Sequence, residues 1–203
     1  MTEENSNGLE NKVIILGEAG VGKTSLIKIS IGQEFDPTYN SSTSVTFNPK
    51  EIKYNNKKYM FNLWDTIGQE KFRSLTKIFY KNSKLVIFVY DITNKSSFES
   101  LEYWINSVKD ELGNDMYIKA IVGNKSDLFL KEQVKEEEAK IYAKEKGAKF
   151  RLCSAKNDPL IFVKFLEELC IDVIELYDDK KEEKTSVKLD EKSSKKNKEK
   201  CGC

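Results

Sequence analysis

Short apolar runs alternate along this chain with longer segments whose apolar residues recur at helical spacing. The run at 85–90 (LVIFVY) has no polar interruption, which is typical of a strand covered on both faces. Two segments at 46–54 and 58–64 flank Asn55-Asn56, a pair that favours the turn of an antiparallel hairpin. The expected strands are 12–16, 46–54, 58–64, 85–90, 117–123 and 150–153.

Helical patterns follow most of these strands. The expected helices are 23–31, a segment carrying Leu101 to Leu112, 135–146, and a last one running from Pro159 to about Tyr177. A capping box at Ser96-x-x-Glu99 predicts the start of the second helix, and Asp158 before Pro159 predicts the start of the last. The alternation after an initial hairpin predicts an α/β fold with a six-stranded, mostly parallel sheet. One antiparallel strand is expected at its edge, with helices on both faces.

The composition changes abruptly at Asp178. Beyond it the chain has no aromatic residue, and Lys, Glu and Ser dominate, so little apolar surface is available to offset the entropy of ordering. We therefore expect one folded domain at 10–177, a disordered N-terminus at 1–9 and a disordered tail at 178–203.

Composition removes several classes of chemistry. The chain has no histidine, which excludes Ser-His and Cys-His catalysis and histidine-ligated zinc or haem. Lys and Arg number 34 against 33 Asp and Glu, so the balance of charge gives no reason to expect nucleic acid as a partner. Cys153, Cys170, Cys201 and Cys203 form neither a disulfide framework nor a zinc site by spacing. The polar N-terminus lacks the apolar stretch of a signal peptide, and no apolar run is long enough to span a bilayer.

The clearest motif is a phosphate loop. Residues 17–24 (GEAGVGKT) match G-x-x-x-x-G-K-[ST] between an expected strand and an expected helix. In that context successive backbone N–H groups and the helix dipole favour an anion. Lys23 is expected to pair with β- and γ-phosphate oxygens and Thr24 to ligate Mg²⁺. The predicted nucleotide contacts of this loop are Glu18, Ala19, Gly20, Val21, Gly22, Lys23, Thr24 and Ser25.

A second motif, Asn124-Lys125-Ser126-Asp127, follows the fifth expected strand and predicts the base. The Asp127 carboxylate can accept hydrogen bonds from both N1–H and the 2-amino group of guanine. Adenine offers no such pair of donors, so binding it would leave a buried carboxylate unpaired. The sequence therefore predicts a guanine nucleotide.

A third motif ends the third expected strand at Trp64-Asp65. Asp65 is placed to hold Mg²⁺ through water, the Gly68 N–H to meet the γ-phosphate and Gln69 to orient the attacking water. Lys23 and Gln69 are thus the predicted catalytic residues. The alternative for this segment is an acidic strand end followed by a plain turn.

Taken together, these motifs resemble the Ras superfamily of small GTPases over about residues 10–177. The phosphate loop, the segment 65–70 (DTIGQE), 124–127 (NKSD) and 154–156 (SAK) occur in the family's order and spacing. Residues 89–94 (VYDITN) and the terminal Cys201-Gly202-Cys203 are most similar to the Rab branch. The resemblance implies a P-loop NTPase fold of three layers, GTP and GDP as substrate and product, and Mg²⁺ as cofactor.

The resemblance also implies how the base is held. Phe35 would pack against the guanine ring, and the stem of Lys125 would lie along it. The Ala155 N–H would meet the guanine carbonyl, with Ser154 and Lys156 completing that loop.

Two positions depart from the family pattern. Ser42 stands where the family has the metal-binding threonine of switch I, with Thr43 as the neighbouring alternative. Ile67 replaces the usual alanine, and its bulk leads to the hypothesis of slow intrinsic hydrolysis. The alternative is that Ile67 points into a small apolar pocket.

Phe47, Trp64 and Phe79 correspond to an aromatic cluster that faces effectors in the Rab branch, although plain core packing is a serious alternative. Five lysines at 192–200 precede Cys201 and Cys203, an ending that resembles the one receiving two geranylgeranyl groups.

The resemblance thus implies regulation of vesicular membrane traffic from the cytoplasmic face of intracellular membranes, with a cytosolic pool. The implied partners are an exchange factor, effectors, a GDP-dissociation inhibitor or escort protein, and an activating protein, because no arginine finger in cis is apparent. A GTP-dependent interaction module with negligible hydrolysis is the alternative from another class. A P-loop kinase would require lid arginines, which a chain with two arginines supplies poorly.

Overall fold

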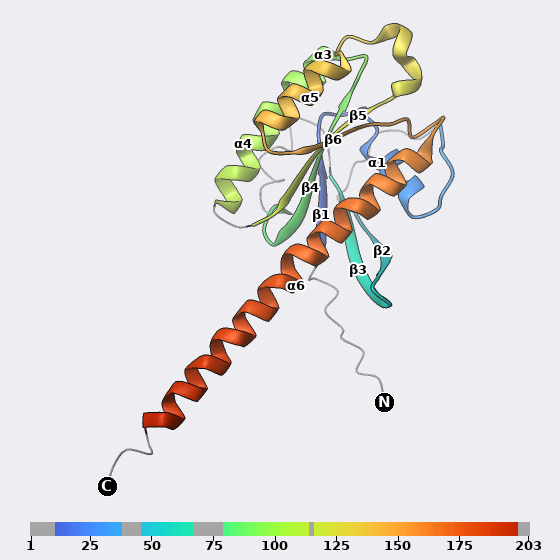
Figure 1. Cartoon of the computed structure of the whole chain (residues 1–203). Helices are drawn as coiled ribbons and strands as arrows, with labels where there is room; N and C mark the ends of the chain where they lie inside the picture. Colours follow the sequence, from blue (N-terminus) through green and yellow to red (C-terminus); the bar gives the residue numbers. More distant parts are fainter. Residues whose placement is uncertain (1–10, 38–45, 67–78, 114–115, 199–203) are drawn as a thin grey trace.

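The computed structural model describes residues 11–37, 46–66, 79–113 and 116–198, with side chains through Asp178. Its strands are β1 (Lys12–Leu16), β2 (Thr46–Tyr54), β3 (Lys57–Asp65), β4 (Ser83–Asp91), β5 (Ile118–Asn124) and β6 (Lys149–Leu152). Its helices are α1 (Lys23–Ser30), α3 (Lys95–Glu99), α4 (Leu101–Leu112), the 3₁₀ helix η3 (Ser126–Lys131), α5 (Glu136–Glu145) and α6 (Pro159–Lys198) (Figure 1).

The strands form one six-stranded sheet in the order β2-β3-β1-β4-β5-β6. β2 pairs antiparallel with β3, and all other neighbours pair in parallel. The β2–β3 turn is Asn55-Asn56, and both residues have left-handed backbone conformations, with φ of 48° and 59°. Two successive residues with positive φ match the twist of a tight hairpin. The predicted fold class, sheet and hairpin are confirmed.

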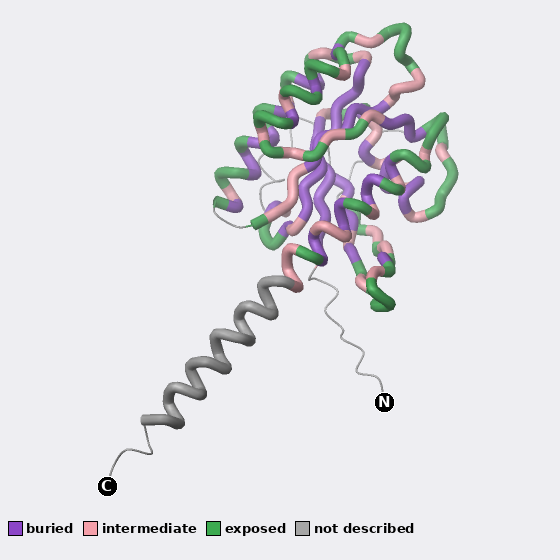
Figure 2. The backbone as a smooth tube through the Cα atoms, viewed as in Figure 1, coloured by how far each residue is buried: buried purple, intermediate pink, exposed green. Residues whose placement is uncertain are grey.

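Helices cover both faces of the sheet, as the alternation of strands and helices predicted. α1 and α6 pack on one face, while α3, α4 and α5 pack on the other. β1 shows the division directly: Val13 and Ile15 point into the first core cluster, and Ile14 and Leu16 into the second. β1 is buried along its whole length, and β4 and β5 are buried from Leu85 and Ala120 to their carboxyl ends (Figure 2).

The predicted capping box at Ser96 is wrong. The helical segment begins earlier, at Lys95, where the Asn94 side chain accepts a hydrogen bond from the Ser97 N–H at 3.2 Å. Ser96 lies inside the first turn of α3 and is exposed. A separate helix, α4, starts at Leu101. The sequence pattern predicted one helix in place of α3 and α4, because the apolar residues of the two helices follow one another at similar spacing.

The predicted end of the last helix near Tyr177 is also wrong, because α6 continues to Lys198. Residues 178–198, expected to be disordered, have helical backbone here. The cause is local: residues 160–201 contain no Gly or Pro, and Lys and Glu are good helix formers. The last fully buried apolar residue is nevertheless Ile174, and Tyr177 packs against the core only in part. The domain edge at 177 stays a prediction.

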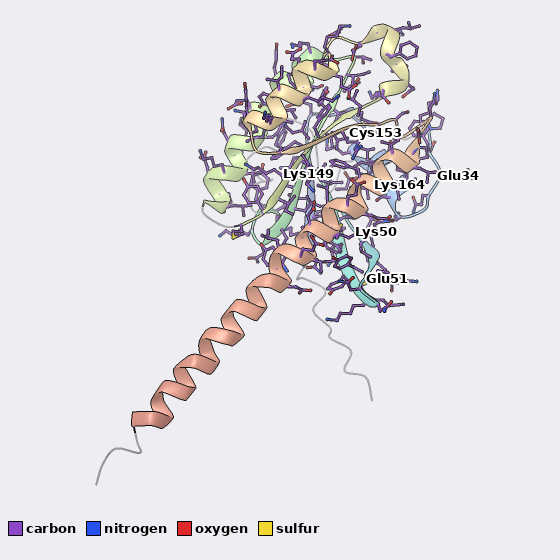
Figure 3. All side chains as sticks on the ribbon, in the orientation of Figure 1. Glu34, Lys50, Glu51, Lys149, Cys153 and Lys164 are labelled. Atoms are coloured by element: carbon purple, nitrogen blue, oxygen red, sulfur yellow. The ribbon has the colours of Figure 1, made fainter. Side chains whose placement is uncertain are left out.

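Polar contacts hold the first half of α6 against the sheet. The Tyr54 hydroxyl donates to Glu175 and the Tyr177 hydroxyl to the Met116 carbonyl, each at 2.5 Å. Lys50 on β2 lies beside α6, with its Nζ 3.6 Å from the Glu167 carboxylate, and Lys149 on β6 pairs with Asp172 at 2.5 Å (Figure 3). Within the described ranges, no helix has the length and apolar character needed to cross a membrane.

Candidate functional site

The described residues of the phosphate-loop, metal and base motifs lie at one end of the sheet, where the parallel strands end. Each of the five parallel strands is followed there by a segment that carries one of the motifs, the arrangement in which α/β sheets bind ligands. These loops are 17–22 after β1, Thr66 after β3, 92–94 after β4, Lys125 after β5 and 153–158 after β6.

The loop after β1 requires glycine at two positions for steric reasons. Gly17 and Gly22 have φ of 147° and 98°. A Cβ on Gly17 would lie 2.2 Å from the Val89 carbonyl oxygen, and one on Gly22 would lie 2.2 Å from Nδ2 of Asn124. Side chains at these positions would push the loop off the sheet. The glycines therefore keep the loop close to β4 and β5, directly before the N-terminus of α1.

Lys23 lies beneath this loop and is only 6% exposed. Its Nζ donates to the carbonyl oxygens of Gly17 at 3.0 Å and Glu18 at 2.8 Å. Burial lowers the pKa of Lys23 to about 8, although the negative charges of Asp65 and Glu18 oppose the shift. The loop thus holds the buried Lys23 ammonium, whose positive charge the carboxylates of Asp65 and Glu18 compensate only in part. This arrangement favours a polyanionic ligand.

The predicted metal ligands Thr24 and Asp65 are neighbours. The Thr24 hydroxyl donates to Oδ2 of Asp65 at 2.7 Å, and Asp65 is 2% exposed. The hydroxyl of Thr66 donates to the Ile15 carbonyl at 2.6 Å, which ties the end of β3 to β1. A hydroxyl and a carboxylate are oxygen donors, the chemistry that Mg²⁺ prefers, so these residues fit the implied metal.

Asn124 joins the phosphate loop to the loop after β6. It is 1% exposed, its Nδ2 donates to the Val21 carbonyl at 2.8 Å, and its Oδ1 accepts from the Ala155 N–H at 3.2 Å. The predicted contact of the Ala155 N–H with guanine stays a prediction, since here that group bonds to Asn124.

The residues of the same motif that are expected to recognise the base are held by side chains from the end of β4 and from the loop after β6. The Ser154 hydroxyl donates to Oδ1 of Asp127 at 2.6 Å. Lys125 has a left-handed backbone with φ of 65°, and its Nζ lies 2.6 Å from Oδ2 of Asp91. Asp127 is half-buried at the open edge of the sheet, a position that suits a carboxylate expected to recognise a base.

The remaining nucleotide residues vary in exposure. Ala19, Gly20 and Lys156 are exposed, and Ser25 is half-buried on α1. Phe35 is half-buried against the core cluster beneath α1 and α6. Its predicted packing on the guanine ring stays a prediction.

The three aromatic residues of the predicted effector cluster do lie together. The Phe47 and Trp64 ring centroids are 5.8 Å apart, and those of Trp64 and Phe79 are also 5.8 Å apart. Trp64 and Phe79 pack partly on the core, whereas Phe47 is 61% exposed. The cluster therefore has a buried base and an open aromatic face, which suits an interaction surface more than core packing alone.

Several predicted residues lie outside the described residues. They are Ser42, Thr43, Ile67, Gly68, Gln69, Cys201 and Cys203. Their assignments stay predictions.

Two supporting residues were not found from the sequence. Trp104, predicted only as an apolar position of its helix, donates its indole N–H to Oε1 of Glu18 at 3.3 Å. Asp91 pairs with Lys125 although it was noted only as part of the segment 89–94. That segment was the one available signal for Asp91, and nothing in the spacing of Trp104 distinguished it from a core residue.

A glycine loop over a buried lysine, an oxygen pair for a metal and a guanine-type base loop define a small GTPase. Residues 12–171 match the sequence model of the Ras family. Similar proteins include Ras-related protein Rab-22A of Homo sapiens, Mus musculus and Canis lupus familiaris. Each is 39% identical over 158 residues, which cover 78% of this chain and 81% of the relative. The chain belongs to the Ras family and is a Rab-type small GTPase, an enzyme that hydrolyses GTP.

Proposed function

We propose that this GTPase cycles between GTP- and GDP-bound states on the cytoplasmic face of intracellular membranes and thereby regulates vesicular traffic. The observation that carries the proposal is the cradle formed by buried Lys23 and the Thr24–Asp65 pair. A cation beneath a glycine loop and two oxygen ligands beside it are the groups that a nucleoside triphosphate with Mg²⁺ needs.

The residues of the cradle stabilise charge. Lys23 in its ammonium form binds the β- and γ-phosphate oxygens, where negative charge develops during hydrolysis. Thr24 and Asp65, with Ser42 as the proposed third ligand, would hold Mg²⁺, which when bound neutralises phosphate charge. Gln69 is proposed to orient the attacking water.

Slow intrinsic turnover follows from the scarcity of arginine. Arg151 pairs with Glu168 of α6 at 3.2 Å and is engaged there rather than at the phosphate cradle. Arg73, the other arginine, lies outside the described residues. An activating protein is therefore proposed to supply the missing positive charge in trans. An exchange factor, effectors and a GDP-dissociation inhibitor or escort protein complete the proposed set of partners.

Recognition of the GTP-bound state is proposed to use Phe47, Trp64 and Phe79. The γ-phosphate would order the segments that carry Ser42 and Gly68, and these segments adjoin β2 and β3 in the sequence. An effector would then read the aromatic face together with the ordered segments.

The test of the guanine site is Asp127→Asn. An amide presents a donor where guanine N1–H and the 2-amino group need an acceptor, so we expect GTP affinity to fall at least about 100-fold. The preference for GTP over ATP should fall with it in competition binding. Asp172→Asn, which disrupts a surface ion pair with Lys149, is the matched control and should keep wild-type preference. Unchanged preference in Asp127→Asn would contradict the proposed function.

The proposed membrane anchor is tested by Cys201→Ser combined with Cys203→Ser. Two lipid groups with the preceding lysines give stable anchoring, whereas a protein without either should leave the membrane fraction. We expect the double variant to become soluble on cell fractionation while its GDP binding remains wild-type. Retention of the double variant on membranes would show that the anchor lies elsewhere.

A further inference from the structure

The turn after β4 adjoins the base loop through the sheet itself. Asp91 is the last residue of β4, and the β4–β5 register places it opposite Asn124. The backbone N–H of Ile92 donates to the Asn124 carbonyl at 3.2 Å. A shift of the backbone at Asp91 therefore acts directly on Asn124, the first residue of the guanine-recognition motif.

Both carboxylate oxygens of Asp91 have partners. Oδ1 accepts from the N–H of Thr93 at 2.8 Å and from its hydroxyl at 2.7 Å, while Oδ2 lies 2.6 Å from the Lys125 ammonium. The Asp91 side chain is only 9% exposed. Donors on both oxygens and shielding from water fix one orientation of the carboxylate, unlike most surface ion pairs.

Further hydrogen bonds from α3 and from residues 133 and 134 hold the turn after β4. The Ser97 hydroxyl accepts from the Asp91 N–H at 3.0 Å and donates to the Asn94 carbonyl at 2.7 Å. The Ile92 carbonyl accepts from the N–H groups of residues 133 and 134 at 2.8 and 3.2 Å. These hydrogen bonds fix the backbone on both sides of the Asp91 side chain.

Lys125 has the complementary geometry. Its left-handed backbone conformation is uncommon for a residue with a side chain, which indicates that tertiary contacts hold it. Its side chain is 34% exposed while its ammonium is paired. With both ends of the side chain fixed, the methylene stem between them has a defined path, and the side chain stays partly exposed.

We propose that Asp91 is a positioning residue for the guanine nucleotide. By holding the Lys125 ammonium, Asp91 fixes the stem that lies along the purine ring and so slows nucleotide release. This inference rests on the proposed guanine site. Because the stem contacts the face of the ring, its effect does not depend on the 2-amino group that Asp127 recognises.

The experiment measures the release of bound GDP and of bound inosine diphosphate, which lacks the 2-amino group, from the full-length protein. The variants are Asp91→Asn, Lys125→Met, their combination, Asp127→Asn and the control Asp172→Asn. We expect Asp91→Asn to accelerate release of both nucleotides by the same factor, about tenfold, because one partner of a shielded ion pair is lost. The combined variant should release no faster than Lys125→Met alone.

Two results would overturn the inference. Release rates of Asp91→Asn within about twofold of wild type would show that the ion pair does not position the nucleotide. Equal acceleration by Asp91→Asn in the wild-type and Lys125→Met backgrounds would show that Asp91 acts through the turn instead. Wild-type GDP release from Asp127→Asn would be a different failure, that of the guanine site itself.

A second variant guards against misfolding of Asp91→Asn. Thr93→Val removes the hydroxyl bond to Asp91 and leaves the carboxylate in place. We expect it to accelerate GDP release several-fold in the wild-type background and not in Lys125→Met. Acceleration in both backgrounds, or in neither, would count against the inference.

Discussion

Asn124 uses both ends of its side-chain amide on protein groups, the Val21 carbonyl and the Ala155 N–H. The predicted contact of Asn124 with the nucleotide stays a prediction. Its described hydrogen bonds connect the loop after β1 with the loop after β6. A single buried amide can therefore align two parts of the candidate site, because its donor and its acceptor point in different directions.

Lys23 makes binding and stability respond to pH in opposite directions. Its pKa of about 8 in the folded protein lies below the ordinary lysine value. Above pH 8 the nucleotide-free site loses the charge that phosphates need, so we expect GDP affinity to fall by up to about tenfold per pH unit. The unfolded chain still holds that proton, so the same group raises the free energy of unfolding between pH 8 and 9.

Two titrations check this expectation. Thermal unfolding of the nucleotide-free protein and GDP binding are each measured from pH 7 to 9, in wild type and in Lys23→Met. The variant should lose the part of each slope that Lys23 contributes. Identical slopes in the two proteins would assign the pH dependence to other groups.

At the residue scale, local motifs predicted the residues that are proposed to bind phosphate and Mg²⁺, but not the residues that hold them in place. Lys23 and Thr24 could be predicted because they belong to one short motif with fixed spacing. Trp104 reaches Glu18 across 86 positions of sequence, and no periodicity records such a contact. The hydrogen bond arises only because α4 packs next to the phosphate loop.

The elements show the same division between local and tertiary causes. The hairpin of β2 and β3 was predictable because its turn residues and strand alternation are local signals. The end of α6 was not predictable in the same way. The loss of apolar residues marks where the helix stops being buried, whereas the helical backbone ends only where the residues have a low helix propensity. The start of α3 was misplaced since several nearby residues are possible caps and tertiary structure selects one.

The cap of α3 can be tested with two neighbouring alanine variants. Asn94→Ala removes the side-chain acceptor for the Ser97 N–H, and we expect the free energy of unfolding to fall by about 1 kcal/mol. Ser96→Ala, at the exposed position that the sequence favoured, should change it by less than about 0.5 kcal/mol. Urea denaturation of the GDP-bound protein measures both changes. A larger decrease in the free energy of unfolding for Ser96→Ala than for Asn94→Ala would favour Ser96 as the cap.

At the scale of the whole molecule, α6 has a docked half and a projecting half. Its side chains bury apolar surface fully as far as Ile174 and in part at Tyr177, and the last described polar contact joins the Tyr59 hydroxyl to Asp178 at 3.1 Å. Beyond that point the helix extends away from the sheet (Figure 1). Stability and nucleotide binding should therefore depend on the chain only through Asp178.

Two truncations test this division. Removing 179–203 should leave GDP release unchanged and the thermal midpoint within about 2 °C of wild type. Removing 172–203 also deletes Val173 and Ile174, each of which contributes about 1.5–3 kcal/mol by burial, so a large fall in stability is expected. A large loss from the shorter truncation would mean that the projecting half contacts the domain.

The two ends of the docked half of α6 lie at opposite ends of the sheet. The helix begins at Pro159, beside the loops at the carboxyl ends of the strands, and leaves the domain at the opposite end of the sheet. The 20 docked residues from Pro159 to Asp178 measure about 30 Å along the axis. A partner that binds both the loops at the carboxyl ends of the strands and the point where α6 leaves the domain must reach across that length, whereas two smaller partners can bind these two places at the same time without colliding.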